Sequence, residues 1–202
     1  MKVDIYPNGP LGSNMYIINT DFGCFLIDPS VDPDKVPIDV RPYKIDAILM
    51  THGHFDHINA VDEWKWIYKD SPIFLAEEDQ VMLKDSAKNG SGMFSELRTY
   101  TSTAYDVDKL KFDGITVIKT PGHSMGSVCY LFEEGEDKVL FSGDTVFEGS
   151  VGRTDLYGGS SRALMNSLKL LKDIPASTDI YPGHGPATTM KEELTFNPFF
   201  NF

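Results

Sequence analysis

Cysteine is scarce in this chain of 202 residues, which has only two. Both of them, Cys24 and Cys129, lie inside apolar runs that are typical of buried strands. Cysteines in such surroundings usually act as small hydrophobic side chains rather than as disulfide partners or reactive thiols. We therefore expect the chemistry of this protein to use other residues.

Basic residues are also few. The chain has 18 Lys and Arg against 30 Asp and Glu, so its formal net charge is −12. Only four are arginines: Arg41, Arg98, Arg153 and Arg162. Surfaces that bind phosphate backbones need clustered positive charge, so this balance argues against a nuclease and predicts no nucleic-acid partner.

Long hydrophobic runs are missing as well. No stretch of 18 apolar residues occurs, and the beginning of the chain lacks the charge pattern and apolar run of a signal peptide. With 41% hydrophobic and 24% charged residues, the composition falls in the globular range and excludes disorder, collagen and coiled coil. We predict a cytoplasmic protein with no membrane partner, folded as one domain over residues 1–202.

Short strands and helices alternate along the chain. The expected strands are 15–18, 24–27, 47–50, 73–76, 109–112, 115–119, 127–132, 138–142 and 178–181, and the expected helices are 58–69, 77–88 and 160–172. Residues 91–105 lack periodicity and predict a surface loop. Four phenylalanines near the end (Phe196, Phe199, Phe200 and Phe202) are expected to dock on their own domain. The pattern predicts an α/β fold with helices covering two sheet layers.

Three histidines and an aspartate cluster in the sequence Thr-His-Gly-His-Phe-Asp-His at 51–57, directly after the strand expected at 47–50. Residues two apart in an extended segment point to the same side, so His52 and His54 can converge on one ion. Asp56 and His57 can then address a second ion nearby as the chain turns into a helix. Imidazole and carboxylate ligands without cysteine suit Zn, Mn or Fe.

The remaining two histidines occupy comparable places. His123 follows a strand in Pro-Gly-His-Ser at 121–124, and His184 follows another in Pro-Gly-His-Gly at 182–185. Asp144 follows a third strand in Ser-Gly-Asp-Thr at 142–145. A glycine beside each one permits a sharp turn and a close approach to a buried ion. Five histidines at strand ends favour a metal site over chance placement.

With these motifs the chain resembles the metallo-β-lactamase superfamily, and within it the glyoxalase II-like (hydroxyacylglutathione hydrolase) branch. The resemblance extends from Met15 to Phe200 and includes the stretches 141–155 and 181–189. It implies an αββα sandwich with the site along the edge between the sheets. It also implies that His52, His54 and His123 form a first metal site and that Asp56, His57 and His184 form a second, with Asp144 bridging both.

The resemblance implies two divalent metal ions, in the first place Zn, with Fe and Mn as alternatives. Two such ions can hold a bridging hydroxide at neutral pH and polarise a carbonyl, so no Ser or Cys nucleophile is needed. The expected reaction is the hydrolysis of a small-molecule thioester such as S-lactoylglutathione, or of a related thioester or ester. Asp56 would be catalytic, because it would both bind metal and orient the nucleophile.

Arg153 matches the position where glyoxalase II enzymes place a basic residue for glutathione, so it is the expected substrate-binding residue. Two departures from the glyoxalase II pattern weaken the expected binding of glutathione. The family usually has Tyr where this chain has Asp155 and Pro186, and it continues into a C-terminal helical domain, whereas this chain stops at Phe202.

Other reactions of the superfamily remain open. A mononuclear iron persulfide dioxygenase shares the ligands but usually reads Ala-His-Asp around the last histidine, where this chain has Gly183-His184-Gly185. A lactonase shares all seven ligands. Class B β-lactamases generally carry Cys at the position of Asp144 and are exported, which makes them a weaker match. A purely structural metal site would show no turnover.

Overall fold

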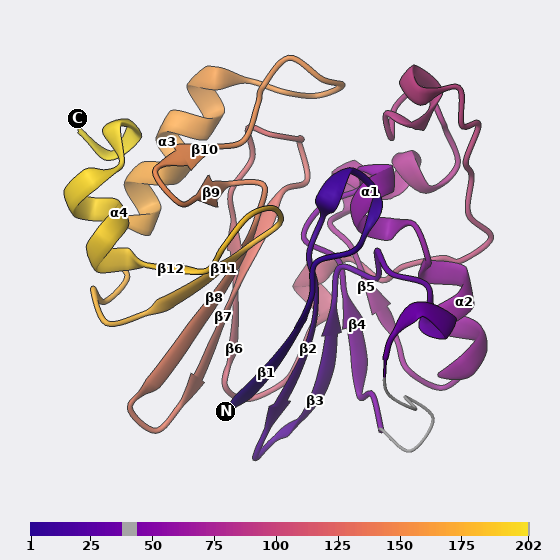
Figure 1. The fold of residues 1–202 in the computed structure, drawn as a ribbon, viewed down its shortest axis with the longest axis horizontal. Coiled ribbons are helices and arrows are strands. Elements are labelled where there is room, and N and C mark those ends of the chain that lie inside the picture. The colour runs from indigo at the N-terminus through magenta and orange to yellow at the C-terminus, as the bar shows by residue number, and fades with distance from the viewer. Residues whose placement is uncertain (38–43, 202) are drawn as a thin grey trace.

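The fold is a four-layer αββα sandwich, as the sequence predicted (Figure 1). The computed structural model describes residues 1–37 and 44–201. Two five-stranded sheets face one another, and helices cover the outer face of each (Figure 1). Among the residues described, no helix is long and apolar enough to cross a membrane.

The first sheet has the strand order β1-β2-β3-β4-β5. Its strands are β1 (Lys2–Tyr6), β2 (Met15–Thr20), β3 (Gly23–Ile27), β4 (Ala47–Leu49) and β5 (Ile73–Phe74). The first three pair antiparallel, whereas β3, β4 and β5 pair parallel. Strands buried on both faces have continuous apolar sequences, which is why β4 could be predicted from its composition.

The second sheet has the order β12-β11-β8-β7-β6. Its strands are β6 (Ile115–Lys119), β7 (Val128–Glu134), β8 (Asp137–Gly143), β11 (Asp179–Pro182) and β12 (Thr188–Thr189). A two-stranded hairpin, β9 (Val146–Phe147) with β10 (Ser150–Val151), follows β8. Strands β8 and β11 pair parallel, so the loops that follow them leave from the same end of the sheet.

The helices are α1 (Phe55–Ile58), α2 (Val61–Ile67), α3 (Ser161–Leu171) and α4 (Met190–Phe196). Short 3₁₀ turns span Pro10–Gly12, Pro33–Lys35, Glu77–Leu83, Ser91–Phe94, Val107–Lys109 and Pro198–Phe200. The Ser160 side chain accepts a hydrogen bond from the Ala163 amide and so caps α3, the helix expected at 160–172.

Three apolar layers hold the sandwich together. The middle layer lies between the sheets and is rich in aromatic rings, among them Phe25, Phe132 and Phe141. The ring of Phe132 lies 5.4 Å from those of both Phe25 and Phe141. An outer layer packs α2 against the first sheet through the fully buried Trp64, and the other packs α3 against the second sheet. Both cysteines are buried and unpaired, as expected.

Several predicted elements were wrong in detail. The helix expected at 77–88 is a 3₁₀ turn over Glu77–Leu83 followed by turns, because the buried Asp79 is bonded to neighbouring loops. The strand expected at 109–112 is absent, since the Asp106 side chain caps a 3₁₀ turn over Val107–Lys109 instead. The helix expected at 58–69 is divided between α1 and α2.

The chain near its end was predicted only in part. Helix α4 was missed, and of the four phenylalanines Phe200 is buried in the layer under α3, whereas Phe196 and Phe199 are exposed. Phe202 lies outside the described residues, as does Arg41. Strand β1 was missed too, because its exposed edge position gives it no continuous apolar run.

Candidate metal centre

All seven predicted ligands lie at one end of the sandwich, on loops that follow strands of both sheets. His52 and His54 follow β4, and Asp56 and His57 lie in α1. The second sheet supplies the other three, with His123 after β6, Asp144 after β8 and His184 after β11. The site is therefore assembled from both halves of the chain.

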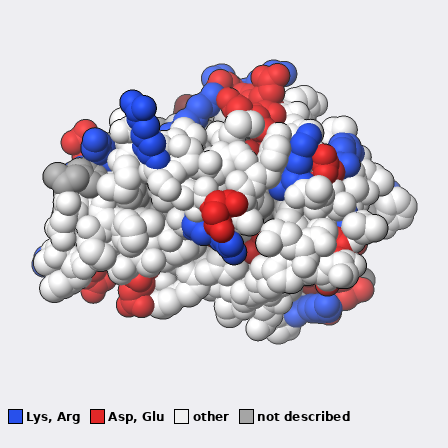
Figure 2. Space-filling view, turned by 90° about the horizontal axis from the view of Figure 1, so that it is seen from above, with Lys and Arg blue, Asp and Glu red and all other residues white. Residues whose placement is uncertain are grey.

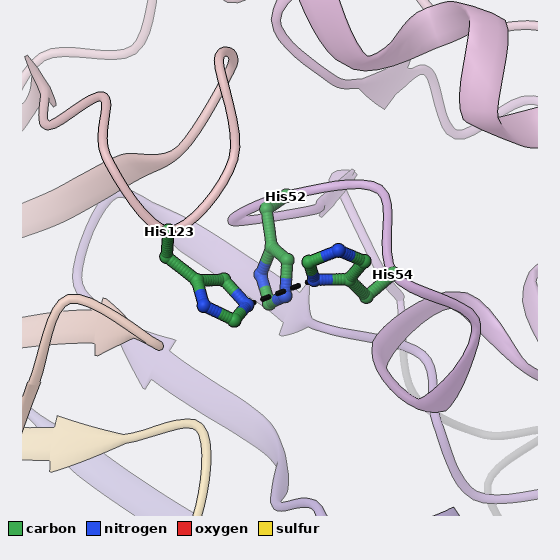
Figure 3. Close-up of side chains that lie close together, drawn as sticks. All are labelled: His52, His54 and His123. Carbon is green, nitrogen blue, oxygen red and sulfur yellow. Dashed lines mark hydrogen bonds between the residues drawn. The ribbon is translucent and has the colours of Figure 1, made fainter. Parts of the chain in front are cut away.

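The first group consists of His52, His54 and His123, which are all buried. One ring nitrogen from each lies within 4.8 Å of the others. His52 and His54 approach from the loop after β4 and His123 from the opposite loop (Figure 3). The Nδ1 atom of His54 lies 2.8 Å from Nε2 of His123.

The second group consists of Asp56, His57 and His184, whose ligand atoms also lie within 4.8 Å of one another. The Nε2 atom of His184 lies 3.2 Å from Oδ2 of Asp56 and 3.3 Å from Nε2 of His57. His57 is fully buried, whereas the side chain of His184 is 27% exposed. The second group thus lies nearer to solvent.

Asp144 stands between the two groups. Its Oδ2 atom lies 3.4 Å from Nε2 of His123, and its Oδ1 atom lies 3.3 Å from Nε2 of His57. Gly183 makes room for this carboxylate, because a Cβ atom at that position would come within 2.1 Å of Oδ1. The arrangement gives Asp144 the position of a ligand shared by both groups.

The unsatisfied polar atoms of the site fit bound cations. Nε2 of His52 and Oδ1 of Asp144 are buried without a hydrogen-bond partner. Buried polar atoms are almost always paired, so each needs a partner that the protein does not supply. Nitrogen and oxygen ligands without sulfur suit Zn, Fe or Mn, and the set therefore fits divalent transition metals.

The outer ring nitrogens of His57 and His52 are held by Asp28 and Thr51, a role that the sequence analysis missed. Asp28 Oδ2 lies 3.0 Å from Nδ1 of His57, and its carboxylate accepts hydrogen bonds from the Thr51 amide and hydroxyl, both at 2.7 Å. The Thr51 hydroxyl also lies 3.0 Å from Nδ1 of His52. Such partners turn the inner nitrogen of each ring toward the metal position.

Asp28 could be recognised only from its place in the fold. It follows β3 at the sheet edge where His52 and His54 follow β4. In the sequence it looks like the ordinary Asp-Pro end of a strand. Its φ of 49° lies in the left-handed region, which is unusual for a residue other than glycine. The fold holds this strained backbone where its carboxylate meets Thr51 and His57.

Charge and burial act in opposite directions within the site. Burial, together with repulsion from neighbouring histidines, lowers the pKa of His54 to about 3 and that of His52 well below its usual value. Burial also opposes charge on His57, but the carboxylates of Asp144 and Asp56 outweigh it and raise its pKa. His57 in turn lowers the pKa of Asp144 against the effect of burial.

A second buried carboxylate, Asp79, joins the two loops that carry the first group. It accepts hydrogen bonds from the Gly53 amide at 3.0 Å, the Gly126 amide at 2.8 Å and the Ser124 hydroxyl at 2.6 Å. Gly53 lies between His52 and His54, and Ser124 follows His123. Sequence reasoning missed this contact because it placed Asp79 on a helix.

The loop of His184 is fastened to the strand β2 and the residues before it. The Asn14 amide donates to the Gly183 carbonyl at 2.7 Å, and its side chain donates to the Gly185 carbonyl at 2.9 Å. The hydroxyl of Tyr16 donates to the carbonyl of Pro182. These bonds fix the loop of the second sheet against the first sheet.

A cavity of about 150 Å³ opens beside both groups. It is lined by five of the predicted ligands (His54, Asp56, His123, Asp144 and His184) and by Leu11, Phe55, Asn89, Gly90, Met93, Phe94, Arg153 and Leu156. Arg153, the expected substrate-binding residue, is paired with Asp155 through Nε–Oδ1 and Nη2–Oδ2 contacts of 2.7 and 2.8 Å. Its backbone carbonyl also accepts from Nδ1 of His123 at 2.8 Å.

Comparison with known proteins identifies the family of this chain. The family model described as the metallo-beta-lactamase superfamily matches residues 8–184. The chain belongs to the metallo-beta-lactamase superfamily. Members of this superfamily bind divalent metal ions, and the histidine and aspartate groups of this chain provide the place for them.

Two curated members of the superfamily match over almost their whole length. The probable metallo-hydrolase YqgX of Bacillus subtilis (strain 168) is 38% identical, over 100% of this chain and 98% of the relative. Hydroxyacylglutathione hydrolase GloC of Haemophilus influenzae is 29% identical, over 100% and 99%. The relatives identify this superfamily member as a metallo-hydrolase.

Solved structures of the superfamily agree in fold. The crystal structure of BLEG-1 B3 metallo-beta-lactamase superposes with a TM-score of 0.89 at 34% identity and covers 100% of both chains. The crystal structure of TTHA1623 in a di-iron-bound form gives 0.86 at 36% identity, covering 97% of this chain and 99% of that one.

Proposed function

We propose that this metallo-hydrolase cleaves thioesters in the manner of a hydroxyacylglutathione hydrolase, with S-lactoylglutathione or a related small acyl thioester or ester as its substrate. The observation that supports this most is the position of Asp144 between two histidine-rich groups beside an open cavity. The similarity to GloC supports the thioester in particular. We also propose that residues 1–202 fold as one domain and that the protein is cytoplasmic.

Two divalent ions, in the first place zinc, are proposed to occupy the two groups. Bound ions of this kind supply Lewis acidity and a water molecule of lowered pKa. His52, His54 and His123 would hold the first and Asp56, His57 and His184 the second, with Asp144 shared. Asp28 and Thr51 keep the outer nitrogens of His57 and His52 occupied, so that the inner nitrogens stay directed at the ions.

Asp56 is the proposed catalytic residue because it is a ligand that also lines the cavity. Burial opposes its charge, but His57 and His184 outweigh this effect and lower its pKa, so it is a hydrogen-bond acceptor at neutral pH. As an acceptor it can orient the attacking water toward the substrate carbonyl. The Asp56→Asn variant should keep the fold and lose most of the activity. Near-wild-type turnover with unchanged metal content would refute this role.

Arg153 is the proposed contact for an anionic group of the thiol. Arg153 lines the cavity and its guanidinium pairs with Asp155, so an incoming carboxylate would exchange for that partner. The Arg153→Ala variant should raise KM for a glutathione thioester several-fold more than for an uncharged thioester. Equal changes in both KM values would show that Arg153 has no such role.

Metal analysis of the purified protein together with an S-lactoylglutathione assay tests the proposal. Two metal ions per chain and thioester hydrolysis are expected. One iron per chain with oxygen uptake on glutathione persulfide would indicate the dioxygenase instead. Hydrolysis of a lactone without any thioester would indicate a lactonase.

β-Lactam hydrolysis is a second candidate because of the 34% identity to BLEG-1 over the full chain. Asp144 stands where class B enzymes generally carry cysteine, which favours the thioester. A nitrocefin assay on the same preparation separates the two. Turnover of nitrocefin above that of every thioester would reverse the order of the candidates.

A further inference from the structure

Five apolar side chains line the cavity beside the metal ligands, and we call them the apolar wall: Leu11, Phe55, Met93, Phe94 and Leu156. They come from four parts of the chain: the 3₁₀ turn before β2, α1, the turn at Ser91–Phe94, and the loop before α3. The rings of Phe55 and Phe94 lie 5.4 Å apart. Four separate segments thus bring hydrocarbon to one place.

Most of the apolar wall is not part of a core. Leu11 is 57% exposed, Met93 66% and Phe94 50%. Single exposed apolar side chains are common, but several that converge on one concave site are typical of a binding surface. The end of the molecule seen from above in Figure 2 has its charged side chains in separate groups, with uncharged surface over most of the area.

The backbone of Leu11 supports a binding role as well. Its φ is 56° and its ψ is 15°, a left-handed conformation that is strained for leucine and natural for glycine. Local stability would therefore be better served by glycine. A leucine that is both strained and half exposed at the mouth of a cavity is better explained by what it contacts there.

The polar groups of the cavity wall are already engaged. Nε and Nη2 of Arg153 donate hydrogen bonds to the two carboxylate oxygens of Asp155. The side-chain amide of Asn89 donates to the carbonyls of Met82 and Arg98, and its oxygen accepts from the Ser91 amide. Among the described residues that line the cavity, apart from the metal ligands and Arg153, most of the contact surface is therefore hydrocarbon.

We infer that the apolar wall binds an apolar acyl chain, so that thioesters of alkanoic acids are hydrolysed faster than those of short hydroxy acids. This inference rests on the proposed thioester hydrolase function. Because Arg153 is assigned to the thiol part, the apolar wall is left for the group on the other side of the carbonyl. The cavity of about 150 Å³ is lined by both the metal ligands and the apolar wall, so an acyl chain held at the wall begins beside the metal groups.

The test uses one uncharged thiol, N-acetylcysteamine, carrying acetyl, butyryl or hexanoyl groups, with the zinc-loaded protein. Burial of each added methylene should raise kcat/KM about two- to fourfold. The Phe94→Ala variant should weaken this dependence, so that kcat/KM for the hexanoyl thioester falls about tenfold more than kcat/KM for the acetyl thioester. The Leu11→Gly variant should do the same without harming the fold, because glycine accepts the observed φ.

Phe196→Ala is the matched control, since this equally apolar ring is 78% exposed on α4 and does not line the cavity. It should leave the chain-length dependence unchanged. If the acetyl thioester is hydrolysed but kcat/KM does not rise toward the hexanoyl thioester, the inference is wrong and the thioester function stands. A steep dependence that Phe94→Ala and Leu11→Gly do not alter would also overturn it.

A binding measurement separates this inference from the proposed function. Titration calorimetry with acetate, butyrate and hexanoate should show affinity that rises with chain length in the wild type and less so in Phe94→Ala. If no thioester is hydrolysed but this binding series is found, the thioester function is wrong and the apolar site stands. If neither the affinity for the carboxylates nor kcat/KM for the thioesters rises with chain length, the apolar site is wrong.

Discussion

Replacing Asp79 with alanine should loosen the two loops that carry His52, His54 and His123. The carboxylate accepts three hydrogen bonds, and alanine leaves the Gly53 and Gly126 amides buried without an acceptor. The Ser124 hydroxyl can still pair with Ser127 at 2.7 Å. Two unsatisfied donors at about 1–3 kcal/mol each give roughly 2–6 kcal/mol.

Part of this loss is offset, because the buried carboxylate is itself unfavourable. Burial raises the pKa of Asp79 even though the three donors oppose that rise, so removal of the charge relieves some desolvation. We expect the free energy of unfolding of Asp79→Ala to fall by about 2–4 kcal/mol. The loss of loop position should also weaken zinc binding at least tenfold.

Urea unfolding of the metal-free protein measures the first effect, and competition with a chromogenic chelator measures the second. Asp108→Ala is the control, because that exposed carboxylate pairs with Lys119 at the surface and its removal should change stability by less than about 0.5 kcal/mol. An Asp79→Ala protein that unfolds within 0.5 kcal/mol of wild type and binds zinc normally would refute the reasoning.

Two other carboxylates give further predictions. The Asp28→Asn variant should keep the fold but lower zinc affinity about 10- to 100-fold, because the single oxygen of an amide cannot accept from both the Thr51 amide and His57. Unchanged affinity in the chelator assay would contradict this role. Asp62 accepts hydrogen bonds from the Thr101 and Ser102 amides, and these outweigh burial and lower its pKa. Its contribution to stability is therefore complete above the unfolded pKa of 3.8 and lost as pH falls through the lower folded value, so the difference in unfolding free energy between wild type and Asp62→Asn should shrink only in that acidic range.

The candidate ligands could be predicted because local sequence marks them. Each lies within a few residues of the end of an apolar strand, and a strand end at a sheet edge is where polar side chains can meet. The helix α3 was predicted for a similar reason, since Ser160 and the leucine spacing identify its start and its buried face. These features depend on neighbours in the chain.

The supporting residues could not be predicted because they depend on distant contacts. Asp28 meets His57 across 29 positions, and Asp79 meets Gly126 across 47. In the sequence, the first looks like the end of a strand and the second like a helix residue. Short edge strands such as β12 pair through the backbone with partners supplied by the fold, and their composition carries little signal.

The sharing of ligands between the two sheets has a consequence for synthesis in the cell. His57 and His184 meet in the second group although 127 positions separate them in the chain. When the ribosome has synthesised the first sheet, it has also synthesised His52, His54 and His57, but not yet Asp144 or His184. A metal ion captured at that stage would be held by an incomplete set and exchange readily, so durable loading can begin only when the second sheet has docked. Metal retention thus reports completed folding.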